Sequence, residues 1–252
     1  MINLNLTLTK VSKFYPKEVF FAADVKPALA NLSFDLLTGQ TLGLIGANGA
    51  GKSTCIRLMM DFIRPDSGTI RIDGCPPGDR RLRHRIGYLP EVASFPPNLT
   101  LSDMLRFVGA THQLSKARLA QQAERWLRAL DLWEVRKRPL QSYSKGMQQR
   151  ASFVLALVHD PELLILDEPM SGLDPIGRAK ISALITDLKA QGKTILFCSH
   201  ILEDVDRLAD RLLILHKGEK RFDGTLPQLH ETYGSQTITQ GFLRAIGEEA
   251  EC

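Results

Sequence analysis

The sequence predicts an α/β fold with a mixed sheet, an antiparallel β part near its start and an inserted block of helices. Three patterns support this prediction: alternating apolar and polar residues near the start, helical spacing from about Leu101 to Asp160, and short apolar strands alternating with helices after that block. The last pattern is typical of a parallel sheet covered on both faces. A chain of 252 residues is long enough to bury such a core.

The first part of the chain combines strands with one strand–loop–helix unit. Apolar and polar residues alternate from Ile2 onward, the period of a half-buried strand. The predicted elements of this part are strands at residues 2–10, 28–36 and 41–46, a helix at 53–63 and a strand at 69–74. The turn RPDSG at 64–68 is expected to stop the helix.

Two serines are expected to start helices in the middle block. Ser115 is predicted to cap one helix, and Ser144 another that ends near His159, before Pro161. The apolar face of the first helix is predicted to comprise Leu119, Trp126, Leu127 and Leu130.

Strands and helices then alternate, and the last 25 or so residues show no strong pattern. The predicted elements are a strand at 163–167, a helix at 178–190, a strand at 194–200, a helix at 201–209 and a strand at 211–216.

Composition excludes several classes of protein. The 32 Lys and Arg against 28 Asp and Glu leave a formal charge of +4, too small to indicate nucleic-acid binding. The four cysteines form no CxxC pair, which favours a reducing cytosol over a disulfide framework or a zinc site. Apolar runs such as FVLALV are far shorter than the roughly 20 residues of a membrane helix. The alternating start also lacks the apolar core of a signal peptide, so we expect a cytosolic chain.

The strongest motif is GANGAGKS at residues 46–53, which fits G-x-x-x-x-G-K-[ST] between a predicted strand and a predicted helix. Its glycines let the backbone N–H groups point inward, and the helix N-terminus attracts anions. Lys52 is expected to reach the β- and γ-phosphates, and the hydroxyl of Ser53 to bind Mg²⁺. The phosphate-binding residues predicted here are Gly46, Asn48, Gly49, Ala50, Gly51, Lys52, Ser53 and Thr54.

Two carboxylates follow the apolar strand at 163–166. In open α/β sheets, ligands bind at the carboxyl ends of strands, where Asp167 would hold Mg²⁺ and Glu168 would act as general base for a water. Because strands often end in acidic residues, this pair is informative only together with the phosphate loop.

The stretch YSKGMQQR at 143–150 narrows the choice among nucleotide hydrolases. With it, the chain from about Leu4 to Gly224 resembles the ATP-binding subunits of ABC transporters, in the family's order and spacing of motifs. The resemblance implies a P-loop ATPase core with a mixed sheet, an antiparallel β subdomain and an inserted α-helical subdomain. It implies a single ATPase domain at 1–235, with its core at about 1–90 and 161–224 and the helical subdomain at about 92–160. The role of a tail at 225–252 stays open.

The resemblance also assigns residues. Ser144, Gly146 and Gln148 match the signature that binds the γ-phosphate of ATP held by the other subunit, although Ser144 alone would be read as a helix cap. Asp174 in SGLDP matches the residue at the subunit interface. His200 matches the histidine that contacts the γ-phosphate and orders the water, although a lone histidine at a strand end is more often structural.

Other matches are looser. Tyr15 resembles the aromatic residue that stacks on adenine, with Phe14 and Phe20 as competitors. Glu91, at the end of GYLPE, stands where the family usually has glutamine, and a carboxylate there can still approach Mg²⁺ and water. The signature departs from its commonest form at Lys145 and Met147. GYLPE and the Lys-Gly-Met pattern resemble exporter-type subunits.

These matches imply an ATPase that uses ATP and Mg²⁺, with no other metal and no nucleic acid. One phosphate loop and one signature in a chain imply a head-to-tail dimer, which we expect to be a homodimer. The partner would be a separate membrane permease, docking near residues 91–105, on the cytoplasmic face of the inner or plasma membrane. The alternatives are an importer subunit, a ribosome- or DNA-associated ATPase and a catalytically silent cassette. The basic run at 79–85 is either a solvated face or a contact with anionic lipid.

Overall fold

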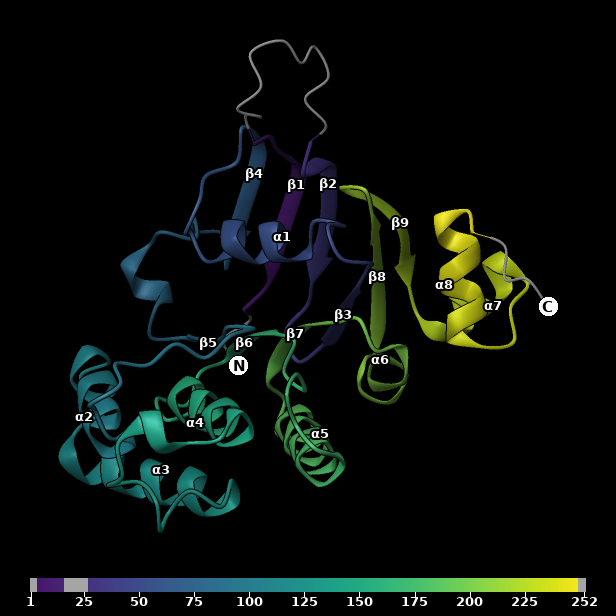
Figure 1. Ribbon diagram of the computed structural model, residues 1–252. Coiled ribbons are helices and arrows are strands. Elements are labelled where there is room, and N and C mark those ends of the chain that lie inside the picture. Colours follow the sequence, from purple (N-terminus) through teal and green to yellow (C-terminus); the bar gives the residue numbers. More distant parts are fainter. Residues whose placement is uncertain (1–3, 16–26, 249–252) are drawn as a thin grey trace, which may run out of the picture. The chain divides into compact units, whose positions relative to one another are not determined.

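The structure is a computed structural model that describes residues 4–15 and 27–248 (Figure 1). The chain divides into two compact units. Unit 1 comprises Met1–Leu82 and Thr194–Cys252, and unit 2 comprises Arg83–Lys193. The predicted strand residue Ile2 and the aromatic competitor Phe20 lie outside the described residues.

Unit 1 contains two sheets. Its elements are β1 (Leu6–Lys13), β2 (Leu29–Leu36), β3 (Thr41–Ile45), α1 (Lys52–Met59), β4 (Ser67–Ile72), the short helix η1 (Arg80–Leu82), β7 (Thr194–Ser199), α6 (Leu202–Leu208), β8 (Arg211–His216), β9 (Glu219–Gly224), α7 (Leu226–Tyr233) and α8 (Ile238–Ile246). Strands β2, β1 and β4 form an antiparallel sheet in that order. Strands β7, β3 and β8 are parallel, and β9 is antiparallel to β8, so the predicted mixed sheet and antiparallel sheet are confirmed.

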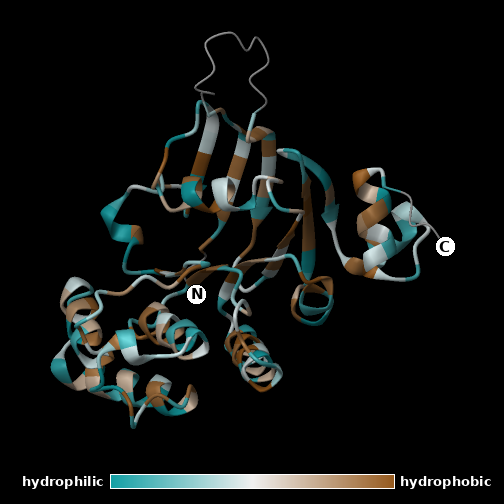
Figure 2. Ribbon diagram, in the orientation of Figure 1, coloured by the Kyte–Doolittle hydropathy of each residue, from teal (hydrophilic) through white to brown (hydrophobic). Residues whose placement is uncertain are grey.

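The core of unit 1 lies around β3 and β7, which are buried along their whole length. Figure 2 shows the neighbouring β8 as mostly hydrophobic, in agreement with its four buried central residues. A strand buried on both faces is apolar without alternation. This explains why these strands were recognised as continuous apolar runs.

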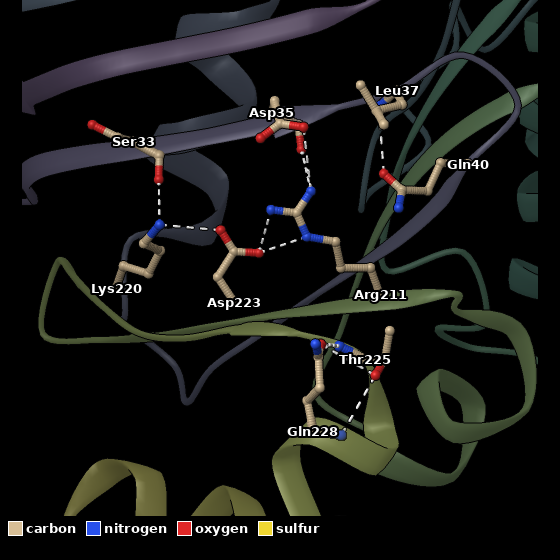
Figure 3. A network of polar contacts seen from close by, with 9 residues as sticks. All are labelled: Ser33, Asp35, Leu37, Gln40, Arg211, Lys220, Asp223, Thr225 and Gln228. Carbon is tan, nitrogen blue, oxygen red and sulfur yellow. Dashed lines mark hydrogen bonds and ion pairs between the residues drawn. The ribbon is translucent and has the colours of Figure 1, made fainter. Parts of the chain in front are cut away.

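An ion-pair network connects β2 to the hairpin of β8 and β9 (Figure 3). The guanidinium of Arg211 lies 2.7 Å from a carboxylate oxygen of Asp223 and donates to the backbone oxygen of Asp35 at 3.0 Å. The ammonium of Lys220 donates to the other oxygen of Asp223 and to the carbonyl of Ser33. The network therefore fixes the antiparallel sheet next to the last strands of the mixed sheet.

Unit 2 combines two strands with the block of helices. Its elements are β5 (Ile86–Leu89), α2 (Leu101–Thr111), α3 (Lys116–Ala129), the short helix η2 (Leu140–Ser142), α4 (Lys145–Leu157), β6 (Leu163–Asp167) and α5 (Pro175–Ala190). Strands β5 and β6 pair in parallel. The predicted caps are confirmed, because the hydroxyl of Ser115 accepts from the N–H of Arg118 and that of Ser144 from the N–H of Met147.

Several predicted boundaries are wrong. Helix α1 ends at Met59, four residues early, because Asp61 adopts a left-handed backbone with φ 58°. Helix α5 starts at Pro175, with Asp174 as its cap, because proline suits the first helical turn. Strands β5 and β9 were not predicted.

The segment that showed no strong pattern holds helices α7 and α8. The sequence signal for the start of α7 was the capping box of Thr225 and Gln228. Gly234, which has a left-handed backbone, ends this helix. No helix in the described ranges is long and apolar enough to cross a membrane.

Candidate functional site

The glycine-rich loop lies between the buried strand β3 and helix α1 in unit 1. Gly51 is the N-cap of α1 with φ 109°, and no side chain caps this helix. The first N–H groups of a helix have no partner within it. The start of α1 therefore presents backbone donors and the positive end of the helix dipole.

Two glycines of the loop are required by close backbone contacts. A Cβ on Gly46 would lie 2.5 Å from the carbonyl oxygen of Leu215, and one on Gly51 would lie 2.6 Å from that of Ala28. Gly51 also has a φ that other residues rarely adopt. The motif thus contains glycine where the fold of unit 1 leaves no room for a side chain.

Lys52 extends into this loop. Its side chain is only 8% exposed, and its ammonium donates to the carbonyl oxygen of Gly46 at 2.6 Å. The neighbouring thiol of Cys55 is fully buried, which raises its pKa to about 12 and keeps it neutral. The loop therefore has one buried cation among backbone amides, an arrangement suited to phosphate.

Gly218 supports the loop and was missed in the sequence. Its N–H donates to the carbonyl of Ala50 at 3.0 Å, and its carbonyl accepts from the N–H of Ala30 at 2.8 Å. Lys217 and Gly218 both have positive φ and connect β8 to β9. A Lys-Gly pair between two strands was the available signal for this tight hairpin turn.

His200 lies beside the phosphate loop. In the pairing of β3 with β7, Ile45 is opposite Ser199, so Gly46 and His200 both begin at the carboxyl edge of these parallel strands. The side chain of His200 is exposed there. Unit 1 therefore brings the predicted histidine to the edge of the sheet from which the phosphate loop starts.

Tyr15 lies just beyond the end of β1 and is 42% exposed, as is Phe14. The N–H of Phe14 and the ammonium of Lys13 both bond to Asp66. These bonds lower the pKa of the Asp66 carboxyl, the backbone N–H having the larger effect. Both aromatic residues therefore stay candidates for stacking on a base.

The predicted acidic residues follow the parallel strands of unit 2. Leu89 pairs with Leu166, so Glu91 and the Asp167–Glu168 pair both follow the same carboxyl edge. Asp167 is 5% exposed and Glu168 is 8% exposed, whereas Glu91 is exposed. Unit 2 therefore places three carboxylates at one edge of its two strands.

The backbone of Glu168 has an unusual conformation. Its φ of 48° is left-handed, which costs on the order of 1–2 kcal/mol for a residue with a side chain. The buried side chain of Gln149 donates to the carbonyl of Pro169 at 3.3 Å, and the carbonyl of Glu168 lies 3.5 Å from the same nitrogen. Like Gly218, Gln149 was not recognised in the sequence as a site residue. Its contacts arise from the packing of α4 against the segment after β6, which the spacing of motifs does not reveal.

The signature residues lie at the start of α4. Ser144 caps this helix, and the side-chain amide of Gln148 donates back to the carbonyl of Tyr143 at 3.3 Å. Apart from its chain neighbours and the backbone of its own helix, the nearest atom to a Cβ on Gly146 would be a side-chain carbon of Leu173 at 3.5 Å. Unit 2 itself therefore has room for a side chain at position 146.

Asp174 lies at the start of α5. Its carboxylate accepts from the N–H of Gly177 at 2.9 Å and so caps α5. The segment from Gly172 to Gly177 and the start of α4 line a cavity of about 470 Å³. The cavity thus joins the signature to the predicted interface residue.

The oxygen atoms predicted to bind Mg²⁺ are divided between the units, with Ser53 in unit 1 and Asp167 and Glu91 in unit 2. Within the described part of the chain, no three His, Cys, Asp or Glu side chains are grouped to hold a metal ion.

Comparisons with known proteins agree with these motifs. Residues 29–171 match the family described as ABC transporter. The uncharacterized ABC transporter ATP-binding protein sll0415 of Synechocystis sp. is 40% identical over 238 residues, which are 92% of this chain and 66% of that protein. The Nod factor export ATP-binding protein I of Sinorhizobium fredii is 39% identical over 221 residues, which are 87% of this chain and 62% of that protein. The chain thus spans less than two thirds of these curated relatives.

A solved structure described as the ATP binding subunit of an ABC transporter matches with a TM-score of 0.85. It is 30% identical, and the match covers 95% of this chain and 98% of that one. The fold predicted from the sequence is therefore confirmed along nearly the whole chain.

Proposed function

Because the chain belongs to the ABC transporter family as an ATP-binding cassette, we propose that it hydrolyses ATP between two cassettes and so drives a separate membrane permease. The observation that supports this most directly is the buried ammonium of Lys52 in the loop before α1. A cation surrounded by backbone amides, at a helix start without a side-chain cap, is suited to a triphosphate.

Unit 1 holds the nucleotide in this proposal. Lys52 and the N–H groups at residues 46–54 bind the phosphates, and Tyr15 stacks on adenine. His200 contacts the γ-phosphate, which is supported by its position beside Gly46 at the sheet edge.

Mg²⁺ fits the donors that the chain offers. Ser53, Asp167 and Glu91 provide oxygen atoms only, the ligands that Mg²⁺ prefers. When bound, Mg²⁺ neutralises charge on the β- and γ-phosphates. We assign Ser53 to the metal directly, and the two carboxylates to the metal or to its waters.

Glu168 is the general base in this proposal. It takes a proton from the water that attacks the γ-phosphate, while His200 and Glu91 orient that water. The left-handed backbone of Glu168 and its support by Gln149 favour this role, because strained conformations persist where the surroundings hold them.

The second cassette is a second copy of this chain. One copy provides the phosphate loop, and the other provides Ser144 and Gly146 to the same γ-phosphate. The open space at Gly146 supports this arrangement, since no atom of unit 2 lies close enough there to require glycine. Asp174 and its loop would lie at the interface between the two copies.

The permease is proposed to dock on unit 2 near residues 91–105. Large apolar side chains are exposed in and beside this stretch, with Val92 at 74%, Leu99 at 40% and Phe107 at 68%. Exposed apolar side chains are suited to burial against a partner protein. We propose export from the Nod factor export relative, and a position on the cytoplasmic face of the membrane.

Replacement of the general base tests the proposal. Glu168→Gln is expected to reduce ATP hydrolysis by roughly 10²–10⁴-fold, because an amide cannot accept the proton. ATP binding should persist, and a dimer should accumulate in analytical ultracentrifugation. Glu134→Gln, an exposed residue of unit 2, is the control and should keep wild-type turnover.

Unchanged hydrolysis in Glu168→Gln would contradict the assignment of the base. An inactive wild-type protein that still binds ATP would indicate a silent cassette. Co-purification with ribosomes or DNA, instead of with a membrane protein, would contradict the transport role.

A further inference from the structure

The cavity at the start of α4 contains three cationic side chains, which differ in how they are paired. Its volume is about 470 Å³, and Lys145, Arg150 and Lys180 line it. Arg150 lies 3.4 Å from a carboxylate oxygen of Asp131, and Lys180 pairs with the same oxygen. Among the described residues, the side chain of Lys145 makes no hydrogen bond and no ion pair. The only free positive charge lining the cavity, within the described part of the chain, is therefore the Lys145 ammonium.

Lys145 is also well placed within the cavity. It is exposed, it follows Ser144 directly, and its Cβ lies 4.0 Å from where a Cβ on Gly172 would be. The other acid of the lining, Asp174, already accepts from the N–H of Gly177. The Lys145 ammonium therefore lines the cavity between the start of α4 and the 172–177 segment and forms no ion pair among the described residues, although the Asp174 carboxylate lines the same cavity.

We infer that Lys145 is a further binding residue for the γ-phosphate held by the other copy, and that its charge makes ATP-driven dimer closure depend on ionic strength. This inference rests on the proposed function, in which Ser144 and Gly146 reach the same phosphate. A hydrogen bond from an ammonium to a phosphate oxygen is roughly twice as strong as one between neutral groups. Glycine, the commonest residue of the signature at this position, cannot supply it.

Unit 2 contains a matched control. Helix α3 also begins with a serine cap and an exposed lysine, Ser115 and Lys116, and Ser115 accepts from the third helical N–H as Ser144 does. Lys116 likewise makes no ion pair among the described residues, but it does not line the cavity. Lys116 therefore has the local chemistry of Lys145 without its position.

The experiment measures ATP-driven dimerisation in the Glu168→Gln background by analytical ultracentrifugation. At low ionic strength, Lys145→Gly and Lys145→Gln are each expected to raise the half-maximal ATP concentration by roughly 10-fold. The difference should shrink at high salt, because exposed charges are screened. Lys145→Arg should restore most of the parent behaviour, and Lys116→Gly should match the parent.

A second measurement separates closure from binding. Fluorescent ATP should bind each monomeric variant as it binds the parent, since Lys52 is unchanged. Equal dimerisation of Lys145→Gln and the parent, or an equal loss in Lys116→Gly, would overturn the inference while leaving the proposed function intact. If the Glu168→Gln parent did not dimerise with ATP, the proposed function would fail and the inference with it.

Discussion

Helices α1 and α4 both begin at residues to which we assign phosphate binding, but they begin differently. Helix α1 starts after the left-handed Gly51 without a side-chain cap, whereas Ser144 caps α4 through its hydroxyl. Lys52 is buried against the loop carbonyls, and Lys145 is exposed and unpaired among the described residues. The start of α1 is thus shaped by contacts within unit 1. The start of α4 leaves room and charge for a group from outside unit 2.

The largest expected effect is at the start of α1. Lys52→Ala should abolish ATP hydrolysis and weaken ATP binding by roughly 10- to 150-fold, because charge-assisted hydrogen bonds to phosphate are lost. Isothermal titration with ATP and Mg²⁺ measures the affinity. Arg57→Ala, an exposed cation on the same helix, is the control and should keep the wild-type affinity. Wild-type affinity in Lys52→Ala would contradict the role of the loop.

Alanine substitutions at Gly51 and Gly146 should differ in their effect on the free energy of unfolding. Gly51→Ala is expected to lower the free energy of unfolding by roughly 2–5 kcal/mol, from its left-handed φ and the 2.6 Å approach to the Ala28 carbonyl. Gly146→Ala should leave that free energy within about 1 kcal/mol of wild type, because its surroundings are open. Urea unfolding measures both variants.

Dimerisation completes the test of these glycines. In the Glu168→Gln background, Gly146→Ala should weaken ATP-driven dimerisation by roughly 5- to 150-fold, since the added methyl group crowds the incoming phosphate. If Gly146→Ala were as unstable as Gly51→Ala, the proposed difference between the two helix starts would be wrong.

The end of α4 differs from its start, because the buried His159 follows the helix there. Its ring stacks on that of His112 at 3.9 Å between centroids, and its Nε2 lies 3.0 Å from the carbonyl oxygen of Ile86. Burial, and next the charge of His112, lowers the pKa of His159 to about 4, against opposing effects of the Ile86 carbonyl and Asp160. The exposed His84 adds a smaller lowering effect.

Acidification should therefore lower the free energy of unfolding of unit 2. The folded His159 binds fewer protons than the unfolded one between about pH 6.5 and 4, so stability falls as the pH drops through this window. The loss should approach about 3 kcal/mol. His159→Phe keeps an aromatic ring but cannot titrate, and its free energy of unfolding should vary less with pH. Parallel pH profiles for the two proteins would contradict this assignment.

Much of the site could be predicted because its signals are local. The loop motif, the carboxylates after β6 and the serine caps each depend on residues a few positions apart, and caps at Ser115 and Ser144 are confirmed. Boundaries were harder, because the end of α1 depends on the backbone of Asp61. Strand β9 and helices α7 and α8 were not predicted, because each is short and its apolar residues are interrupted by polar ones.

The sequence by itself predicted the order of most strands and helices and the family, since motif spacing and periodicity are properties of neighbouring positions. The phosphate-binding residues that it named stay predictions. Only the tertiary structure decided that Gly218 supports Ala50, that Gln149 contacts the backbone after Glu168, and that Arg211 links distant Asp35 and Asp223. The physical reason is that these contacts join residues 12 to 176 positions apart. Their geometry follows from how the strands and helices pack and not from local preference.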